Sequence, residues 1–312
     1  MKAWLLLFSC NLMWALQFTC IKLVQDQVGP LFTVWGPMTL ATLMLWPLVR
    51  REGTRPPITK ARKGWLPQAV LFLVLALFGV FPGQVLVTIG TRMSLASNAA
   101  LLMLALPVCT AAMAFFFLGE RMKLVRAISF IMAIAGVILC SMNDFKGFDL
   151  GATYLIGNML ILSGVLGSAF YNSYGKRVLE SYSELEMLYG TYVAMFVVMT
   201  PFVLLKEWHT FAQIGGFTAR TWIGLALLAF FHNFLSMVLF LKALNHLDAS
   251  QAALSNYLIT IFGLIIAAVW LGEKLTLPAI IGGVMVLAGT LIVTIGEQKS
   301  KATPTASAFV AN

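Results

Sequence analysis

Ten apolar runs of helical length, each without an internal Asp, Glu, Lys or Arg, divide the chain. They cover residues 3–21, 27–49, 64–91, 93–119, 127–143, 150–175, 187–205, 221–241, 249–272 and 275–296. A helix needs about 20 apolar residues to cross a bilayer, whereas porin-type strands are only about 10 residues long. Charged residues make up 11% of the chain, against about 25% in soluble domains. The sequence therefore predicts an all-α polytopic membrane protein with ten transmembrane helices.

One part of the sequence occurs twice at a fixed spacing. ASNAALLMLALP starts at Ala96 and precedes LGER at 118–121, and ASQAALSNYLIT starts at Ala249 and precedes LGEK at 271–274. This pattern indicates an internal repeat. The predicted organisation is a first repeat at 3–141 (spans 1–5), a second at 152–296 (spans 6–10) and a disordered cytoplasmic tail at 297–312. An odd number of spans per copy inverts the second copy in the membrane, as in secondary transporters.

The basic residues predict the orientation of the chain. Its net charge is +9, and if the N-terminus is cytoplasmic, 15 of the 21 Lys and Arg residues fall on the cytoplasmic side. The loop from Arg50 to Lys63 holds six of them. The positive-inside rule therefore predicts a multi-pass protein of the cell (inner) membrane with both termini in the cytoplasm. The positive charge is explained by topology, and no nucleic-acid partner is expected.

Catalytic and metal-binding motifs are absent from the sequence. It has no HExxH, no GxSxG elbow and no phosphate-binding loop. The four cysteines lie in apolar runs without a CxxC pair, which favours packing over metal ligation or disulfides. We therefore expect a transporter rather than an enzyme, with no cofactor and no metal. A membrane-embedded enzyme and a non-transporting sensor or scaffold remain the alternatives.

Two Leu-Gly-Glu turns close spans 4 and 9. Gly119 and Gly272 fit the left-handed position that follows a helix. Glu120 and Glu273 are expected to open the next helix and to face its positive end. Because they fall near the membrane surface, where ionisation costs little, a structural role is favoured over proton carrying.

Polar side chains inside the spans are the candidates for a substrate site, because amides and imidazoles in hydrocarbon must turn inward to find partners. For any single amide, a hydrogen bond between helices is an equally good explanation. Their clustering favours a cavity, in which the aromatic members could contact a ring or a cationic amine. The predicted lining residues are Trp14, Gln17, Gln84, Asn98, Tyr171, His232, Asn233, Asn256 and Tyr257.

The duplicated five-span unit, with Lys22 and Lys176 closing spans 1 and 6 and the two Leu-Gly-Glu turns, resembles the EamA-type branch of the drug/metabolite transporter superfamily. The resemblance covers residues 3–296. It implies a metabolite carrier, in many members an exporter of amino acids or similar solutes. It also implies a central cavity lined by spans 1, 3, 4, 6, 8 and 9. The expected partners are a small-molecule substrate and the lipid bilayer, and the chain is expected to be a monomer or a homodimer.

The distribution of acids bears on energy coupling. All 12 Asp and Glu residues lie in loops or at span ends, and His232 is the one imidazole near a span centre. A proton-coupled carrier usually keeps a titratable group in its path. A neutral His232 bonded to an amide or hydroxyl is favoured over a proton carrier, because charging a buried imidazole is costly. We therefore expect a facilitator of a neutral or zwitterionic solute in which His232 orients the substrate. Direction of transport stays open.

Overall fold

A computed structural model describes residues 2–52, 65–110, 113, 124–142, 152–179, 182–244 and 255–302. Each of the ten apolar runs contains helix. The first five hold α1 (Lys2–Val24), α2 (Pro30–Glu52), α3 (Trp65–Val74) with η1 (Leu75–Val80) and α4 (Gly83–Met93), α5 (Ala96–Leu102) with η2 (Met103–Ala105), and α7 (Leu124–Cys140). The last five hold α8 (Ala152–Leu179), α9 (Glu184–Lys206), α11 (Ala219–Ala226) with η4 (Leu227–Leu235) and α12 (Ser236–Leu244), α14 (Tyr257–Leu271) and α15 (Leu277–Ala302). Short α10 (Trp208–Gln213) and η3 (Ile214–Gly216) join α9 to α11.

Six of these helical segments are long and apolar enough to cross a membrane: 4–24, 30–51, 69–93, 152–175, 184–206 and 219–240. Shorter apolar helices occupy 96–110, 127–140, 257–271 and 277–292. Large apolar side chains on the outside, such as Leu205 and Val269, are 78% and 81% exposed. An exposed apolar surface of this kind fits contact with lipid. The prediction of an all-α membrane chain is confirmed.

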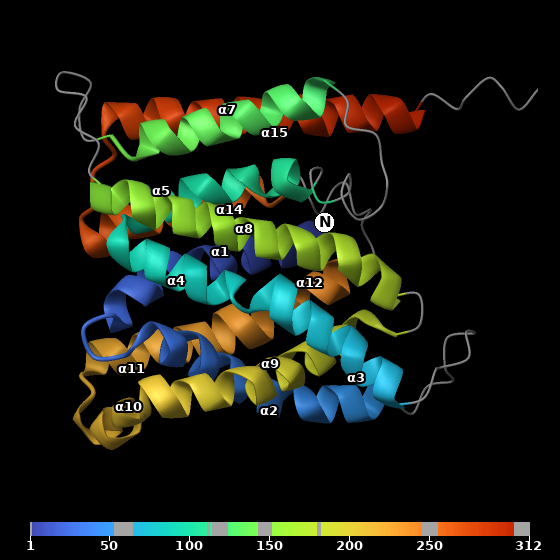
Figure 1. Cartoon of the computed structure of the whole chain (residues 1–312), viewed down its shortest axis with the longest axis vertical. Coiled ribbons are helices and arrows are strands. Elements are labelled where there is room, and N and C mark those ends of the chain that lie inside the picture. The colour runs from blue at the N-terminus through green and yellow to red at the C-terminus, as the bar shows by residue number, and fades with distance from the viewer. Residues whose placement is uncertain are drawn as a thin grey trace, which may run out of the picture.

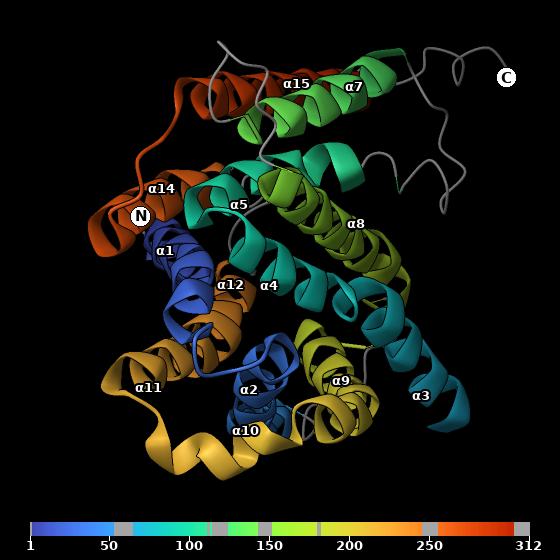
Figure 2. The ribbon, with the colours of Figure 1, turned by 60° about the vertical axis from the view of Figure 1, so that its left-hand side comes forward.

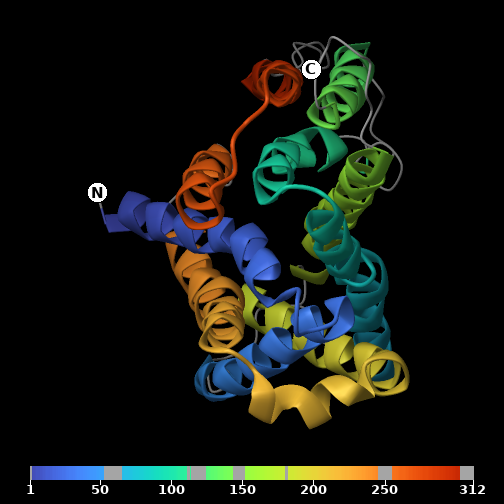
Figure 3. The same ribbon diagram turned by 90° about the vertical axis from the view of Figure 1, so that its left-hand side faces the viewer.

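The helices lie side by side and are stacked along the long axis of the molecule (Figure 1). α7 packs on α15 at one edge, α4 packs on α8, and α2 packs on α9 at the opposite edge. α1 lies between α14 and α12 near the centre of the stack (Figure 2). The turns at 25–29, 94–95, 207–218 and 272–276 gather at one end of the helices, which we call the turn end (Figure 3).

Glycines allow α4 and α8 to approach closely. A Cβ atom added at Gly164 would lie 2.5 Å from the carbonyl oxygen of Gly83, and one added at Gly157 would lie 2.8 Å from that of Gly90. Membrane helices pack closely where small residues face each other. The α4–α8 pair joins span 3 to span 6, so this contact fixes the first half of the chain against the second.

Two π-helices interrupt spans at related positions. η1 covers 75–80 and η4 covers 227–235. With the repeat offset of 153 residues, residues 75–80 correspond to 228–233, which lie within η4. π-Helical turns are rare and are frequent at functional sites. Of these two segments, η4 contains His232 and Asn233. The helix after η1 restarts at Gly83, beyond Pro82.

The tail differs from its prediction. α15 continues through residue 302, although disorder was predicted from 297. Residues 297–302 contain no Gly or Pro that would end a helix. Residues 303–312 lie outside the described residues, as do Gly119 and Glu120.

Candidate substrate cavity

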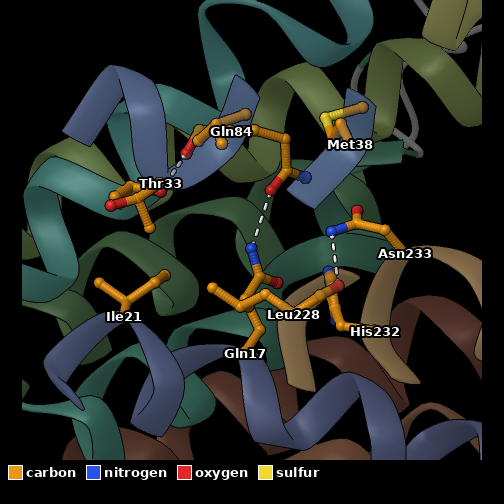
Figure 4. Close-up of a pocket in the computed structure, with 10 residues that line it drawn as sticks. Gln17, Ile21, Thr33, Met38, Gln84, Leu228, His232 and Asn233 are labelled. Carbon is orange, nitrogen blue, oxygen red and sulfur yellow. Dashed lines mark hydrogen bonds between the residues drawn. The ribbon is translucent and has the colours of Figure 1, made fainter. Parts of the chain in front are cut away.

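A small cavity lies between α1, α2, α4 and η4 (Figure 4). It has about 20 Å³ of water-accessible space, which is enough for about one water molecule. Its lining residues are Gln17, Ile21, Thr33, Val34, Met38, Gln84, Thr88, Leu228, His232 and Asn233. None of these side chains carries a fixed charge. The cavity therefore offers hydrogen bonds from amides, hydroxyls and one imidazole beside aliphatic and thioether surface.

Helical periodicity explains how each element contributes to the cavity. Gln17 and Ile21 are four residues apart on α1, and Gln84 and Thr88 are four apart on α4. Residues four apart lie on one face of a helix. In η4, the side-chain amide of Asn233 donates to the carbonyl of Leu228 at 2.8 Å, five residues earlier in the chain. This bond holds Asn233 against the wall of the π-helix.

Hydrogen bonds within the lining join different helices. Nε2 of Gln17 donates to Oε1 of Gln84 at 2.9 Å, which links α1 to α4 across the cavity. The hydroxyl of Thr88 donates to the carbonyl of Gln84 at 2.8 Å, and that of Thr33 to the carbonyl of Gly29 at 2.7 Å. Both threonine oxygens therefore keep lone pairs that can accept from a bound solute.

His232 is 9% exposed and contributes to the wall opposite Gln84. Its imidazole lies against the main chain of α1 at Met13 and Trp14. Nδ1 has no hydrogen-bond partner among the described residues. A buried ring nitrogen without a partner is costly, so a solute that supplies a partner gains binding free energy here.

The structure brings Gln17, Gln84, His232 and Asn233 into one lining, and the other five predicted residues lie elsewhere. Trp14 packs on Phe240 with ring centroids 5.0 Å apart. Asn98 donates to the carbonyl of Cys140 at 3.0 Å, as expected for an amide that joins helices.

The remaining three aromatic and amide candidates also have structural surroundings. Tyr171 packs against Gly79: a Cβ atom added at Gly79 would lie 3.0 Å from the Cβ atom of Tyr171. Asn256 is the residue before α14, and Tyr257 at its start packs against the core around α1 and α5. These positions were predicted because polar and aromatic types stood out in the spans, but type alone does not distinguish a cavity from a helix contact.

Span 2 contributes residues that the sequence analysis missed. Thr33, Val34 and Met38 of α2 line the cavity, although the family resemblance implied a lining from spans 1, 3, 4, 6, 8 and 9. Spacing offers a usable signal. Ile21 follows Gln17 by four residues and Thr88 follows Gln84 by four, so helical spacing from a candidate amide predicts these two lining residues but not those of span 2.

Comparison with known proteins gives the family. The model of the EamA-like transporter family matches residues 1–142 and again residues 155–295. The chain belongs to the EamA-like transporter family. This is a family of membrane transporters, so the chain is a multi-pass membrane protein of a transporter family.

Relatives of this EamA-family chain are named transporters. A probable terminal-alkyne amino-acid exporter of Streptantibioticus cattleyicolor is 27% identical over 294 residues, which cover 93% of this chain and 94% of the relative. An uncharacterized transporter of Archaeoglobus fulgidus is 24% identical over 295 residues, covering 94% and 99% of the two chains. A solved crystal structure with 15% sequence identity shares the fold at a TM-score of 0.62 and covers 96% of this chain and 99% of its own.

Two acids of this EamA-family chain join its halves at the turn end. Gly272 has φ 68°, and the Glu273 carboxylate after it accepts hydrogen bonds from the main-chain N–H groups of Ala96 (2.9 Å) and Ser97 (2.8 Å). Glu273 was predicted to face the N-terminus of the helix that follows it, α15. It faces the N-terminus of α5 instead. The hydroxyl of Thr276 instead accepts from the N–H of Ala279 at 3.3 Å in α15. That cap leaves Glu273 to reach α5.

Glu207 makes the second contact of this kind. It follows α9, is 8% exposed, and accepts from the N–H groups of Leu31 (3.0 Å) and Phe32 (2.7 Å) at the start of α2. Gln27 adds a third contact: its Oε1 accepts from the hydroxyls of Thr218 (3.0 Å) and Thr221 (2.6 Å). All three contacts cross from residues before 100 to residues after 200.

The turn between α1 and α2 is held by a guanidinium. Nη2 of Arg92 donates to the carbonyl of Gln25 at 2.7 Å and to that of Val28. Nζ of Lys22 donates to the carbonyl of Arg92 at 3.0 Å. These cations therefore bind main-chain oxygens near the C-terminal ends of α1 and α4, where positive charge is favourable. Arg92 lies four residues, about one helical turn, beyond Thr88 of the cavity, and Lys22 directly follows Ile21.

Proposed function

We propose that this chain carries a small neutral or zwitterionic solute, such as an amino acid or an amine, through the cavity that Gln17, Gln84, His232 and Asn233 line. The observation that carries the proposal is a small cavity lined by amides, hydroxyls and an imidazole, without a charged side chain, between helices of a transporter-family protein. Amides and an imidazole bind solutes through hydrogen bonds and do not retain a solute by strong ionic attraction. The name of the Streptantibioticus relative supports an amino-acid-like substrate.

The proposed mechanism is alternating access between two inverted five-span repeats, 3–141 and 152–296. Helix packing supports it. Each span of one repeat has a counterpart five spans away in the other. When every span is replaced by its counterpart, the contact of α4 with α8 (spans 3 and 6) becomes that of η4 and α12 with α1 (spans 8 and 1). The contact of α1 with α14 (spans 1 and 9) becomes that of α8 with α5 (spans 6 and 4). In the pairs α2–α9, α7–α15 and α5–α14, the two contacting helices are each other's counterparts, so these contacts are unchanged by the replacement. Such exchange is what a two-fold axis between inverted repeats produces.

The proposed route needs no proton. The cavity has no carboxylate, and His232 is a buried imidazole that lies against α1. Transport would thus be facilitative, with His232 orienting the solute. A thermal-shift screen of purified protein against metabolites would find the ligand, because a solute that binds the native state raises its melting temperature.

Proteoliposomes loaded with a solute found in that screen test the proposal. Uptake should persist without a pH gradient, and His232→Gln should raise KM while uptake stays independent of the gradient. His209→Gln is the matched control, because His209 is exposed on α10 outside the cavity. Concentrative uptake that is driven by a proton gradient and abolished by His232→Gln, but not by His209→Gln, would overturn the facilitative mechanism.

We also propose cytoplasmic termini in the inner membrane, from the asymmetry of basic residues. A cysteine at Thr54, in the basic loop outside the described residues, should resist a membrane-impermeant thiol reagent added to intact cells. A cysteine at Gln213, exposed at the turn end, should react. The four native cysteines are buried and give little background. Labelling at Thr54 alone would reverse the proposed orientation.

A further inference from the structure

An apolar groove lies between spans 3, 4 and 6 and shares no lining residue with the polar cavity. It holds about 450 Å³ of water-accessible space, within the range of about 300 to 1,000 Å³ that is common for small-molecule sites. Its lining residues are Val74, Phe78, Met113, Leu166, Gly167, Phe170 and Tyr174. None of these residues is charged, and Tyr174 alone has a polar side-chain group. The groove therefore suits an apolar ligand.

One face of α8 forms a wall of the groove. Leu166, Phe170 and Tyr174 follow one another at intervals of four residues, so they lie on the same face of the helix. Phe170 stacks on Tyr174 with ring centroids 5.3 Å apart. The ring of Phe78 in η1 is 5.9 Å from that of Phe170. Three aromatic rings from two different spans thus line the space.

This wall continues the surface of α8 that faces lipid. α8 lies on the outside of the stack of helices (Figure 1). Ile156 is 53% exposed and Ser163 is also exposed, and they come 14 and seven residues before Phe170. Seven residues are close to two helical turns, so all three lie along one face. On the opposite wall, Phe78 is 62% exposed. The groove is therefore continuous with the lipid-facing surface of a membrane protein.

The groove extends about as far as one leaflet of a bilayer. Leu166 and Tyr174 are eight residues apart, which is about 12 Å along a helix, and half of the hydrocarbon core is about 15 Å. Tyr174 lies at the end of the apolar segment 152–175, and Phe78 lies near the middle of the segment 69–93. Tyrosine is common where a span meets the membrane surface. The groove thus runs from one membrane surface towards the midplane, as a lipid chain does.

The bilayer itself supplies an occupant for such a groove. Its core holds no water that could fill the space, and the mobile groups beside the exposed ring of Phe78 are acyl chains. An aliphatic chain has no polar atom along its length and therefore matches a lining without charge. Burial against aromatic and aliphatic side chains favours each methylene group of the chain.

We propose that this groove binds one acyl chain of a membrane phospholipid. The chain lies along Leu166 and Phe170, with the headgroup beyond Tyr174. α8 approaches the turn end at Gly157, which packs on Gly90 of α4, so Tyr174 lies at the other end of α8 and the bound lipid belongs to the leaflet away from the turn end. The chain contacts η1 of the first half and α8 of the second, so it stabilises the pairing of spans 3 and 6.

Photo-crosslinking locates the bound chain. The protein is reconstituted in liposomes of phosphatidylethanolamine and phosphatidylglycerol that contain a small fraction of phosphatidylglycerol with a diazirine in its acyl chain. After illumination, mass spectrometry identifies the labelled residues. Label should concentrate on residues 166–174, above the label on α14 around Val269, which is 81% exposed on the outside. Equal labelling of the two regions would reveal contact with bulk lipid alone and would overturn the proposal.

A variant that fills the groove provides the second test. In Val74→Trp the indole occupies the space, and label on residues 166–174 should fall by at least about four-fold, the factor for the burial of one methylene group. Leu166→Trp is a second filling variant if the first melts far below the wild type. Val269→Trp is the matched control, because it makes the same substitution at a lipid-facing residue outside the groove. Unchanged label in both filling variants contradicts a bound chain.

Competition separates a resident lipid from a transported solute. Metabolites that raise the melting temperature of the protein are added before illumination, and label on residues 166–174 should stay at the level found without them. A metabolite that removes the label would make the groove part of a solute path and would overturn the lipid assignment. Phospholipid retained after purification in detergent gives an independent readout, and the wild type and Val269→Trp should retain more of it than Val74→Trp.

Discussion

Glu273 and Ser97 are 176 residues apart in the chain and form two hydrogen bonds with each other. One oxygen of the Glu273 carboxylate accepts from the main-chain N–H of Ser97 at 2.8 Å and from its hydroxyl at 2.7 Å. The first turn of α5 has unpaired N–H groups and a positive dipole end, and the carboxylate satisfies both. A residue of the last inter-span turn thus caps a helix of the first half.

Removing this cap should lower stability. Glu273→Gln keeps the shape of the side chain but loses the charge, and we expect the free energy of unfolding to fall by about 1 kcal/mol. Ser97→Ala removes only the hydroxyl bond and should cost less. Thermal melting of the purified variants in one detergent measures both changes. Equal melting temperatures for wild type and Glu273→Gln would contradict the assignment.

Glu207 and Gly29 should be energetically coupled. A Cβ atom at residue 29 would collide with the Glu207 carboxylate, so Gly29→Ala must displace the acid from the N-terminus of α2. Each of Gly29→Ala and Glu207→Ala should destabilise by about 1 to 2 kcal/mol. The double variant should lose clearly less than the sum, because the second change removes what the first displaces. Additive losses would show that the two residues act independently.

The Gln17–Gln84 bond predicts that the losses of stability in the two single variants do not add up in the double variant, and that all three variants raise KM for transport. Gln17→Leu leaves Oε1 of Gln84 without its donor, and Gln84→Leu leaves Nε2 of Gln17 without its acceptor. Each single change should cost about 1 kcal/mol, and the double change should cost less than the two together. All three variants should raise KM for the transported solute. Unchanged KM in the double variant would remove both residues from the site.

Contact between α4 and α8 predicts a sharp difference between two glycines. Gly164→Ala places a Cβ atom 2.5 Å from the Gly83 carbonyl oxygen, whereas a Cβ at Gly215 meets nothing within 4 Å. The first change should destabilise by about 1 to 3 kcal/mol through overpacking. Gly215→Ala should leave the melting temperature nearly unchanged. Similar melting of both variants would argue against the close crossing.

Sequence patterns predicted the helices better than the side-chain partners. Charge-free runs located the helices because desolvating a charge is costly in any arrangement. The hydrogen-bond partner of Glu273 could not be predicted from these runs, because α5 is far from Glu273 in the sequence and lies beside it only in the folded chain. Asn98 illustrates the same limit: its amide type suits a cavity and a helix contact equally, and only the carbonyl of Cys140 at 3.0 Å decides between them.

Met38 and Thr33 were overlooked for a different reason. The prediction drew its polar candidates from amides and an imidazole, and span 2 holds neither in its interior. A cavity surface includes every side chain that faces it, polar or not. The π-helical turn at His232 and Asn233 was also invisible in the sequence, because the residues of η4 read as an ordinary apolar helix.

The contacts of Glu207, Glu273 and Gln27 have a consequence for an empty carrier. Each of them joins the two halves at the same end of the molecule, so in the proposed alternating-access mechanism an opening at this end that separates the halves breaks all three contacts. Such a barrier keeps the open population small until a bound solute offsets its cost. In the alternating-access mechanism proposed above, such a seal predicts that the protein conducts no ions when it has no cargo, so that the membrane potential is preserved between transport cycles.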